Sequence, residues 1–377
     1  MEQGFTRGEN DKCIFHHQEK NLLLLLYVDD CLGDGEPEEV EWIFNLLAER
    51  FQCKDTEYVT VDIPQDYLGS DIILTDGFLY IPMQTYIENA CRILNITGKK
   101  HDTPITSPIE PESPLLTPSE RKEFLTGLGM LGWLAQTTRC DVSFTYSRIG
   151  QHSANPKQSS MAAVRRAFAY LLGQKNRCIR SPVYGIDRDI SDITNLRRSI
   201  DIWRFYVDTD HAGNSEEQNK RRSQNGVLGT LNGAPNLWGS KASSMAFASE
   251  LIGEAHADIS STAVEIFGAG NATFDIMGLS YIVEEMGMVF PYPFTLEMDN
   301  EGARIFTENS AQRSKLKHID CRRRKEWVKT LRDRNICIPV HIPTADNLAD
   351  IFTKILPRQT FVKFRDQLLF EYDLVQD

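Results

Sequence analysis

Zinc-ribbon and disulfide patterns are missing from this sequence, although it contains eight cysteines. The cysteines are scattered, and no two of them form a Cys-x-x-Cys pair. Because zinc ribbons and disulfide scaffolds show characteristic cysteine spacings, we expect free thiols and a reducing compartment. The sequence also lacks an apolar run of the roughly 18 residues that a membrane-spanning helix needs. No basic segment followed by an apolar one opens the chain, so we expect neither secretion nor a membrane partner.

An excess of basic residues is also absent, because the net charge of the chain is −12. This balance by itself does not indicate a nucleic-acid-binding protein. The charge is unevenly spread, since residues 312–334 contain ten Lys or Arg and three acids. Such a stretch could neutralise phosphates, and a solvated basic helix face is an equally good interpretation. The candidate nucleic-acid-binding residues in it are Arg322, Arg323, Arg324 and Lys325.

Proline and glycine patterns divide the chain into three segments. Five prolines crowd residues 104–118, which excludes a helix there and indicates a linker. Residues 174–200 are polar and irregular and form a second boundary. At 377 residues the chain is long enough for two or three domains with cores of their own. We therefore expect domains at 1–100, 101–195 and 196–377.

The expected secondary structure differs between these segments. The first combines a hairpin at 21–35 with an amphipathic helix at 37–50. The second consists mainly of helices, at 119–138 and 157–172. In the third we expect strands at 202–208, 226–232, 235–239, 293–298 and 336–342, and helices at 262–286, 300–308, 317–334 and 346–353. Acids at strand ends among such elements indicate an α/β fold with a mixed sheet.

Four acids stand where expected strands or helices begin or end: Asp208, Glu265, Asp299 and Asp350. Two Mg2+ ions about 4 Å apart need several hard, anionic oxygen ligands that different elements bring to one point. For any one of these acids alone, a surface carboxylate is the ordinary interpretation. Together, and in this order, they predict the metal centre of a two-metal phosphodiester hydrolase.

Four sequence motifs point to one family. Leu24–Asp30 is an apolar run that ends in Tyr-Val-Asp-Asp, and Thr137–Ser143 reads Thr-Thr-Arg-Cys-Asp-Val-Ser. Tyr206–Gly213 surrounds the first of the four acids, and Asn347–Lys354 surrounds the last. In this order the motifs resemble the reverse transcriptase palm signature, the connection region, and the start and end of the RNase H domain in copia-type LTR retrotransposons. The chain is similar, nearly end to end, to the C-terminal part of their Pol polyprotein.

This resemblance implies an α/β fold with an RNase H-like mixed-sheet domain at 196–377. A truncated reverse transcriptase palm at 1–100 and a linker with a helical thumb or connection region at 101–195 would precede it. The implied activity is that of an RNase H, a metal-dependent endonuclease that hydrolyses RNA in RNA–DNA hybrids. The implied partners are the hybrid and other Pol-derived chains that supply the missing palm and integrase. The implied location is a cytoplasmic virus-like particle or the nucleus.

The resemblance also assigns roles to the four acids. Asp208 would bridge two metal ions, either Mg2+ or Mn2+. Glu265, Asp299 and Asp350 would complete the ligand sets of the two ions. The stretch before Glu265 is longer than the family pattern, so Glu254 is the alternative second acid.

The pair Asp29 and Asp30 would be the remnant of a polymerase site. The palm motif that carries the first polymerase aspartate is not in this sequence, so we expect no reverse transcriptase activity from the chain alone. A decayed or co-opted remnant that binds nucleic acid without cutting it is the alternative to an active RNase H. An interpretation of Asp208–Asp210 as the D-x-D metal site of a nucleotide-sugar transferase leaves the later acids unexplained.

Overall fold

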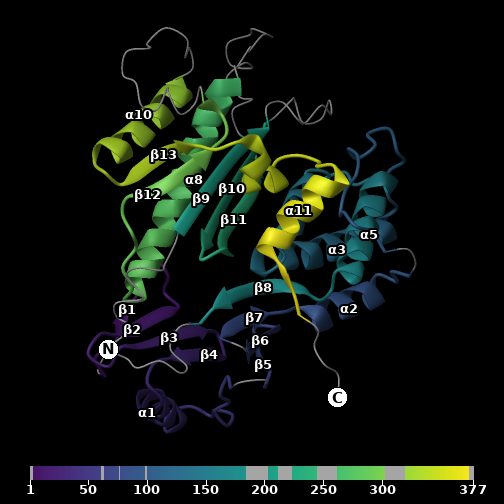
Figure 1. Ribbon diagram of the computed structural model, residues 1–377. Helices are drawn as coiled ribbons and strands as arrows, with labels where there is room; N and C mark the ends of the chain where they lie inside the picture. The colour runs from purple at the N-terminus through teal and green to yellow at the C-terminus, as the bar shows by residue number, and fades with distance from the viewer. Residues whose placement is uncertain are drawn as a thin grey trace.

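The computed structural model shows a mixed α/β protein with three sheets among the residues that it describes (Figure 1). These residues are 3–60, 63–75, 77–97, 100–183, 203–210, 223–243, 261–301 and 319–372, with the backbone alone for 261–263 and 319–322. Helices and strands both occur in each of the three expected segments. The predicted α/β class is therefore confirmed.

The first sheet is an antiparallel meander at the start of the chain. Its strands follow in chain order: β1 (Thr6–Arg7), β2 (Ile14–His17), β3 (Leu22–Tyr27) and β4 (Asp30–Asp34). Leu22 and Leu24 of β3 share one buried face, because side chains alternate along a strand. Helix α1 (Pro37–Ala48) has a proline in its first turn, and its Ile43 packs on that face. The predicted hairpin and the helix after it are thus confirmed.

A second antiparallel sheet joins distant parts of the chain in the order β14-β8-β7-β6-β5. Its strands are β5 (Gln65–Tyr67), β6 (Ser70–Thr75), β7 (Phe78–Ile81), β8 (Arg177–Pro182) and β14 (Phe370–Glu371). Each of the three expected segments contributes to this sheet. It therefore joins the segments, and the domain boundaries near residues 100 and 195 stay predictions.

A helical layer lies beside this sheet (Figure 1). Its helices are α2 (Gln84–Ile93), α3 (Pro118–Thr137), α4 (Ser143–Gly150), α5 (Gln158–Gly173) and α11 (Arg358–Leu368). Helix α3 begins with a capping box, in which Thr117 and Glu120 each accept a hydrogen bond from the other's backbone N–H. Phe124, Phe168 and Phe364 are buried in the shared core of this layer. The predicted helices of the middle segment are confirmed.

The third sheet is mixed and has the order β11-β10-β9-β12-β13. Its strands are β9 (Trp203–Asp210), β10 (Gln224–Leu231), β11 (Ala234–Ala242), β12 (Phe294–Met298) and β13 (Cys337–His341). Strands β9, β10 and β11 are antiparallel, whereas β12 runs parallel to both β9 and β13. All five strands expected in the C-terminal segment are present, so the prediction of a mixed sheet is confirmed.

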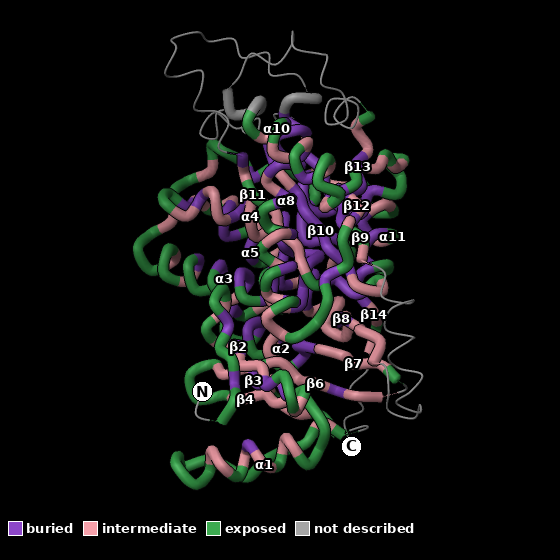
Figure 2. The backbone as a smooth tube through the Cα atoms, turned by 90° about the vertical axis from the view of Figure 1, so that its left-hand side faces the viewer, coloured by how far each residue is buried: buried purple, intermediate pink, exposed green. Residues whose placement is uncertain are grey.

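Both faces of the mixed sheet are covered. Helices α8 (Ser261–Glu285) and α10 (Ile319–Asp333) pack on one face, where Phe205 and Val207 of β9 join their core (Figure 1). Tyr206, between these two residues, belongs to the core of the helical layer on the other face. Buried residues are accordingly concentrated around the strands of this sheet (Figure 2). The mixed sheet and the helical layer therefore share one core.

One helix among the described residues, the Val264–Glu285 part of α8, has the length and apolar composition of a membrane span. Within this helix, 56% of the 18-residue apolar segment is buried inside the protein. Its packing against the mixed sheet accounts for the apolar composition, because the core helix of a globular domain passes the same test.

Candidate metal centre

Asp208 lies near the end of β9 with only 3% of its surface exposed. In the antiparallel ladder it stands opposite Gly226 of β10. A Cβ atom at Gly226 would lie 2.7 Å from the side chain of Thr353 and 3.0 Å from the carbonyl oxygen of Ala349. The missing side chain therefore lets the segment that carries Asp350 pack directly against β10, beside Asp208.

Glu265 and Asp299 form a cluster of three acids with Asp208. Glu265 lies near the start of α8 and is buried, and Asp299 directly follows β12 and is half-buried. One carboxylate oxygen of each acid lies within 4.8 Å of the other two. A strand end, a helix start and a second strand end thus bring hard anionic oxygens to one point, as a divalent cation requires. The alternative second acid, Glu254, lies outside the described residues.

The segment with Asp350 is a 3-10 helix, η4 (Leu348–Phe352), within the range 346–353 where we expected a helix. Asn347 determines its start. The Nδ2 group of Asn347 donates to the carbonyl oxygen of Val207 over 3.1 Å, and its Oδ1 accepts from the N–H of Ala349 over 3.1 Å. Side-chain bonds of this kind favour a tight turn over a continuing helix. The bond to Val207 also ties η4 to β9.

Asp350 is 5% exposed and is joined to Asp208 through a lysine. The Nζ atom of Lys354 lies 2.8 Å from Oδ1 of Asp350 and 3.5 Å from Oδ2 of Asp208. Thr353 donates its hydroxyl hydrogen bond to the same Oδ2 of Asp208. The other three predicted acids therefore lie around Asp208. The sequence motifs assigned no role to Lys354, although its spacing of four residues from Asp350 indicates an ion pair.

Burial and mutual repulsion raise the pKa values of two of the acids. Burial is the largest cause for Glu265, whose pKa rises to about 9, and the charges of Asp208 and Asp299 add to it. Burial and the charge of Asp208 raise the pKa of Asp350 to about 7, although Lys354 opposes the rise. Burial by itself would lower the pKa of Lys354, but the neighbouring carboxylates raise it above its usual value. A divalent cation would relieve the same repulsion, so this set of donors fits a metal.

The other predicted acidic pair, Asp29 and Asp30, lies at the turn between β3 and β4, and both residues are exposed. Val28 before them is 88% exposed and has a φ of 55°, which a β-branched residue rarely adopts. Among the described residues, neither acid belongs to a cluster that could hold a metal. The structure thus provides no third carboxylate for this pair within the described part of the chain.

Only part of the predicted basic stretch faces solvent. Arg323 is exposed near the start of α10, whereas Lys325 is only 7% exposed. The guanidinium of Arg324 lies 4.5 Å from the centre of the Phe274 ring on α8, so it packs between the two helices. The interpretation of a fully solvated basic face is therefore wrong for Arg324 and Lys325. The side chain of Arg322 lies outside the described residues, and phosphate binding by this stretch stays a prediction.

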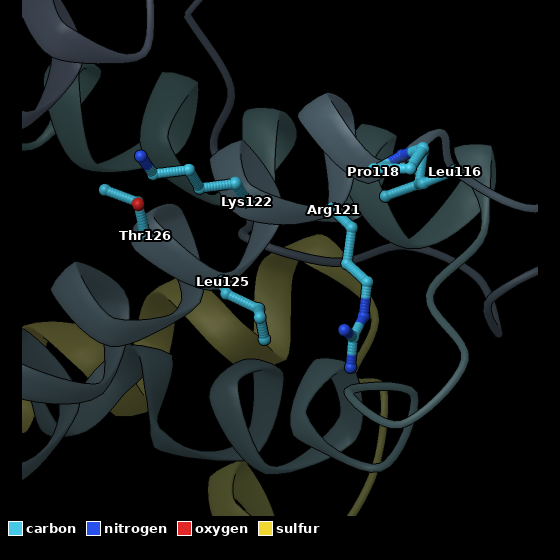
Figure 3. Close-up of a pocket in the computed structure, with 6 residues that line it drawn as sticks. All are labelled: Leu116, Pro118, Arg121, Lys122, Leu125 and Thr126. Carbon is cyan, nitrogen blue, oxygen red and sulfur yellow. The ribbon is translucent and has the colours of Figure 1, made fainter.

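A groove of about 580 Å³ lies along the start of α3 (Figure 3). It is lined by Leu116, Pro118, Arg121, Lys122, Leu125 and Thr126. None of the four acids lines this groove, and the ionisable side chains that do are basic. The groove therefore offers no ligands for a divalent cation.

The fold and the acidic cluster together define an α/β protein with a candidate divalent-metal centre. The chain is 26% identical, over 97% of its length, to the retrovirus-related Pol polyprotein from transposon RE1 of Arabidopsis thaliana. It is 25% identical, over 95% of its length, to the corresponding polyprotein from transposon TNT 1-94 of Nicotiana tabacum. A third such polyprotein, from transposon RE2 of Arabidopsis thaliana, is 25% identical over 96% of the chain.

By sequence, the chain is therefore a relative of retrotransposon Pol polyproteins, as its motifs predicted. It spans about a quarter of the length of these curated relatives, namely 23% of the RE1 protein, 25% of the TNT 1-94 protein and 23% of the RE2 protein. No protein-family model matches the chain, and no solved structure matches it.

Proposed function

We propose that this chain is a metal-dependent RNase H, an endonuclease that hydrolyses the RNA strand of RNA–DNA hybrids. The observation that carries the proposal is the cluster of Asp208, Glu265 and Asp299 at one edge of the mixed sheet, with Asp350 beside it. The relationship to retrotransposon Pol polyproteins supports nucleic acid as the substrate. The order of the four acids along the chain supports the assignment to RNase H.

Two bound ions, Mg2+ or Mn2+, would activate the attacking water and stabilise the leaving 3′ oxygen. Asp208, Glu265 and Asp299 would hold one ion, and Asp208 with Asp350 would hold the other. Because Asp208 belongs to both ligand sets, its loss should affect both positions. Glu265 has to release its proton before it can bind a cation, since carboxylates bind metals in their ionised form.

Substrate binding would depend on groups outside the acidic cluster. The A-like shape of the duplex and the 2′-hydroxyl of the RNA strand would be the features that distinguish a hybrid from DNA. Arg323, which is exposed on α10, is a described member of the basic stretch that could contact a phosphate. Asp29 and Asp30 would need other Pol-derived chains to form a polymerase site. A cytoplasmic particle or the nucleus is the location that we infer from this role.

The experiment that tests the proposal is hybrid cleavage by the full chain in Mg2+ or Mn2+, with RNA duplex and DNA duplex as comparison substrates. Wild-type protein should cut only the RNA strand of the hybrid. The variant Asp208→Asn should lose at least about 100-fold in cleavage rate, because it removes a ligand shared by both ions. Its hybrid affinity should stay close to that of the wild type, since no phosphate contact is lost.

The matched control is Asp333→Asn, which neutralises an exposed acid at the end of α10 outside the cluster. This control should cleave like the wild type. A wild-type protein that binds hybrid but never cuts it in either metal would instead favour the remnant that only binds nucleic acid.

A further inference from the structure

The four acids of the metal centre fall into two sets that differ in how their charge is balanced. Asp208, Glu265 and Asp299 form a set that we call open, because among the described residues its one ion pair is that between Asp208 and Lys354. Asp208 and Asp350 form a second set, and the Lys354 ammonium lies between their oxygens at 3.5 Å and 2.8 Å. The two positions that a divalent ion could take are therefore not equivalent.

The geometry of η4 places the lysine between the two acids. Lys354 follows Asp350 by four residues, so its side chain folds back over the turn that carries the carboxylate. Thr353, between them, bonds Asp208 and fixes the end of the turn on β9. The side chain of Lys354 keeps 34% of its surface exposed, which leaves the ammonium a short path to solvent.

An ammonium and a divalent ion cannot share this position. A divalent ion such as Mg2+ contacts carboxylate oxygens at about 2.1 Å, so an ion between Asp208 and Asp350 would compete with the Lys354 ammonium for the same two carboxylates. The ammonium already contacts these oxygens at hydrogen-bonding distance or little more. Two cations between the same pair of carboxylates would repel each other strongly, because their separation would be only a few ångströms.

We propose that Lys354 is a built-in cation that holds the Asp208–Asp350 half of the centre, so that divalent ions bind in a fixed order. The first ion enters the open set of Asp208, Glu265 and Asp299. The second ion binds only when the ammonium leaves Asp350 and moves into solvent. Lys354 is thus a positioning residue. It weakens binding of the second ion, which has to displace the ammonium first. This inference rests on the proposed metal centre and not on the identity of the substrate.

The test is a titration of the metal-free full chain with Mn2+, followed by calorimetry and by the electron paramagnetic resonance signal of free Mn2+. Wild-type protein should bind one ion tightly and a second ion about tenfold or more weakly, as competition with a bound group of this kind predicts. Lys354→Met keeps most of the length of the side chain and removes the charge. It should strengthen the second step by about the same factor and leave the first step nearly unchanged.

Two further variants separate a charge effect from a structural one. Lys354→Arg keeps a cation between the carboxylates and should retain the weak second step. Lys363→Met removes an ammonium that bonds the carbonyl oxygen of Ala345, outside the acidic cluster, and should bind Mn2+ like the wild type. If Lys354→Met does not fold, Lys354→Gln carries the same expectation with a polar side chain.

Two equally tight sites in the wild type, or the same isotherm for wild type and Lys354→Met, would overturn the inference. Ordered Mn2+ binding in a protein that never cuts hybrid would support the inference and overturn the proposed reaction. A protein that binds no Mn2+ at all would overturn both.

Discussion

Asp208 is the residue on which the candidate site depends, because every other group of the centre is arranged around it. Glu265 and Asp299 lie close to it, and Lys354 links it to Asp350. Their carboxylates are close together and largely buried, so the metal-free centre holds unfavourable charge. The stability of the protein should therefore respond to pH and to metal at this one point.

The pKa of Glu265 predicts how stability depends on pH. An acid whose pKa is raised by folding binds its proton more tightly in the folded state, so its contribution is present at low pH and is lost as pH rises. For Glu265 this loss extends from its ordinary value of 4.5 to about 9. The melting temperature of the metal-free protein should thus fall as pH rises through this range. Mg2+ should raise the melting temperature more at pH 8 than at pH 5.

Thermal melting at several pH values, with and without millimolar Mg2+, measures this effect. Glu265→Gln removes the titrating group and should flatten the pH dependence of the metal-free protein. A Mg2+ effect of the same size at pH 5 and pH 8 would speak against a metal site built on this acid.

At the level of secondary structure, the site depends on close contact between η4 and the mixed sheet. Gly226 of β10 makes this contact possible, because any side chain there would collide with Thr353 and with the backbone at Ala349. Asn347 binds the start of η4 to β9 from the other side. The position of Asp350 is therefore determined by the packing of two strands under one short helix.

Gly226→Ala should displace η4 and with it Asp350. We expect a loss of about 1–3 kcal/mol in the free energy of unfolding, as for other additions to a packed core. Binding of the second Mn2+ should weaken, because Asp350 would move away from Asp208. The measurements are urea unfolding and the Mn2+ titration.

The matched control for this change is Gly239→Ala in the neighbouring strand β11. There the added Cβ would meet Val227 at 3.4 Å, an ordinary contact distance. This control should keep wild-type Mn2+ binding. Equal effects of the two substitutions on metal binding would mean that η4 does not depend on the glycine.

In the whole molecule, the mixed sheet and the helical layer share a core, and a buried ionic network lies within the helical layer. Arg139 donates to both carboxylate oxygens of Asp141, at 3.0 Å and 2.7 Å. The hydroxyl of Tyr170 on α5 donates to the same carboxylate over 2.5 Å. The side chains of Arg139 and Asp141 have no exposed surface. Such a network stabilises the fold only while each charged group keeps its partner.

Asp141→Asn should therefore destabilise the whole chain by about 3–5 kcal/mol, because it leaves the buried guanidinium of Arg139 without its counter-ion. Urea unfolding, followed by circular dichroism and by tryptophan fluorescence, measures the change. Glu123→Gln breaks the exposed ion pair with Arg165 and serves as the control, with an expected cost of at most about 1 kcal/mol. A loss for Asp141→Asn as small as for the control would show that the network is not needed for stability.

Much of the architecture follows from local signals in the sequence. Apolar runs and alternation correctly predicted all five strands of the mixed sheet, and helix signals correctly predicted α3 and α5. The motifs around the four acids, through their resemblance to the retrotransposon family, predicted which acids would form the candidate centre. These features depend on neighbours in the chain, which a sequence shows directly.

Other features of the fold and of the candidate site are visible only in the tertiary structure. It showed that Arg324 packs against Phe274 of α8, that Lys325 is buried, and that η4 is a 3-10 helix. It also showed that β14 pairs with β8, far from it in the chain, so that the segments share a core. The tertiary structure likewise showed that Lys354 lies between Asp350 and Asp208. Each of them depends on contacts between distant residues, which arise only when the elements pack and which local patterns do not encode.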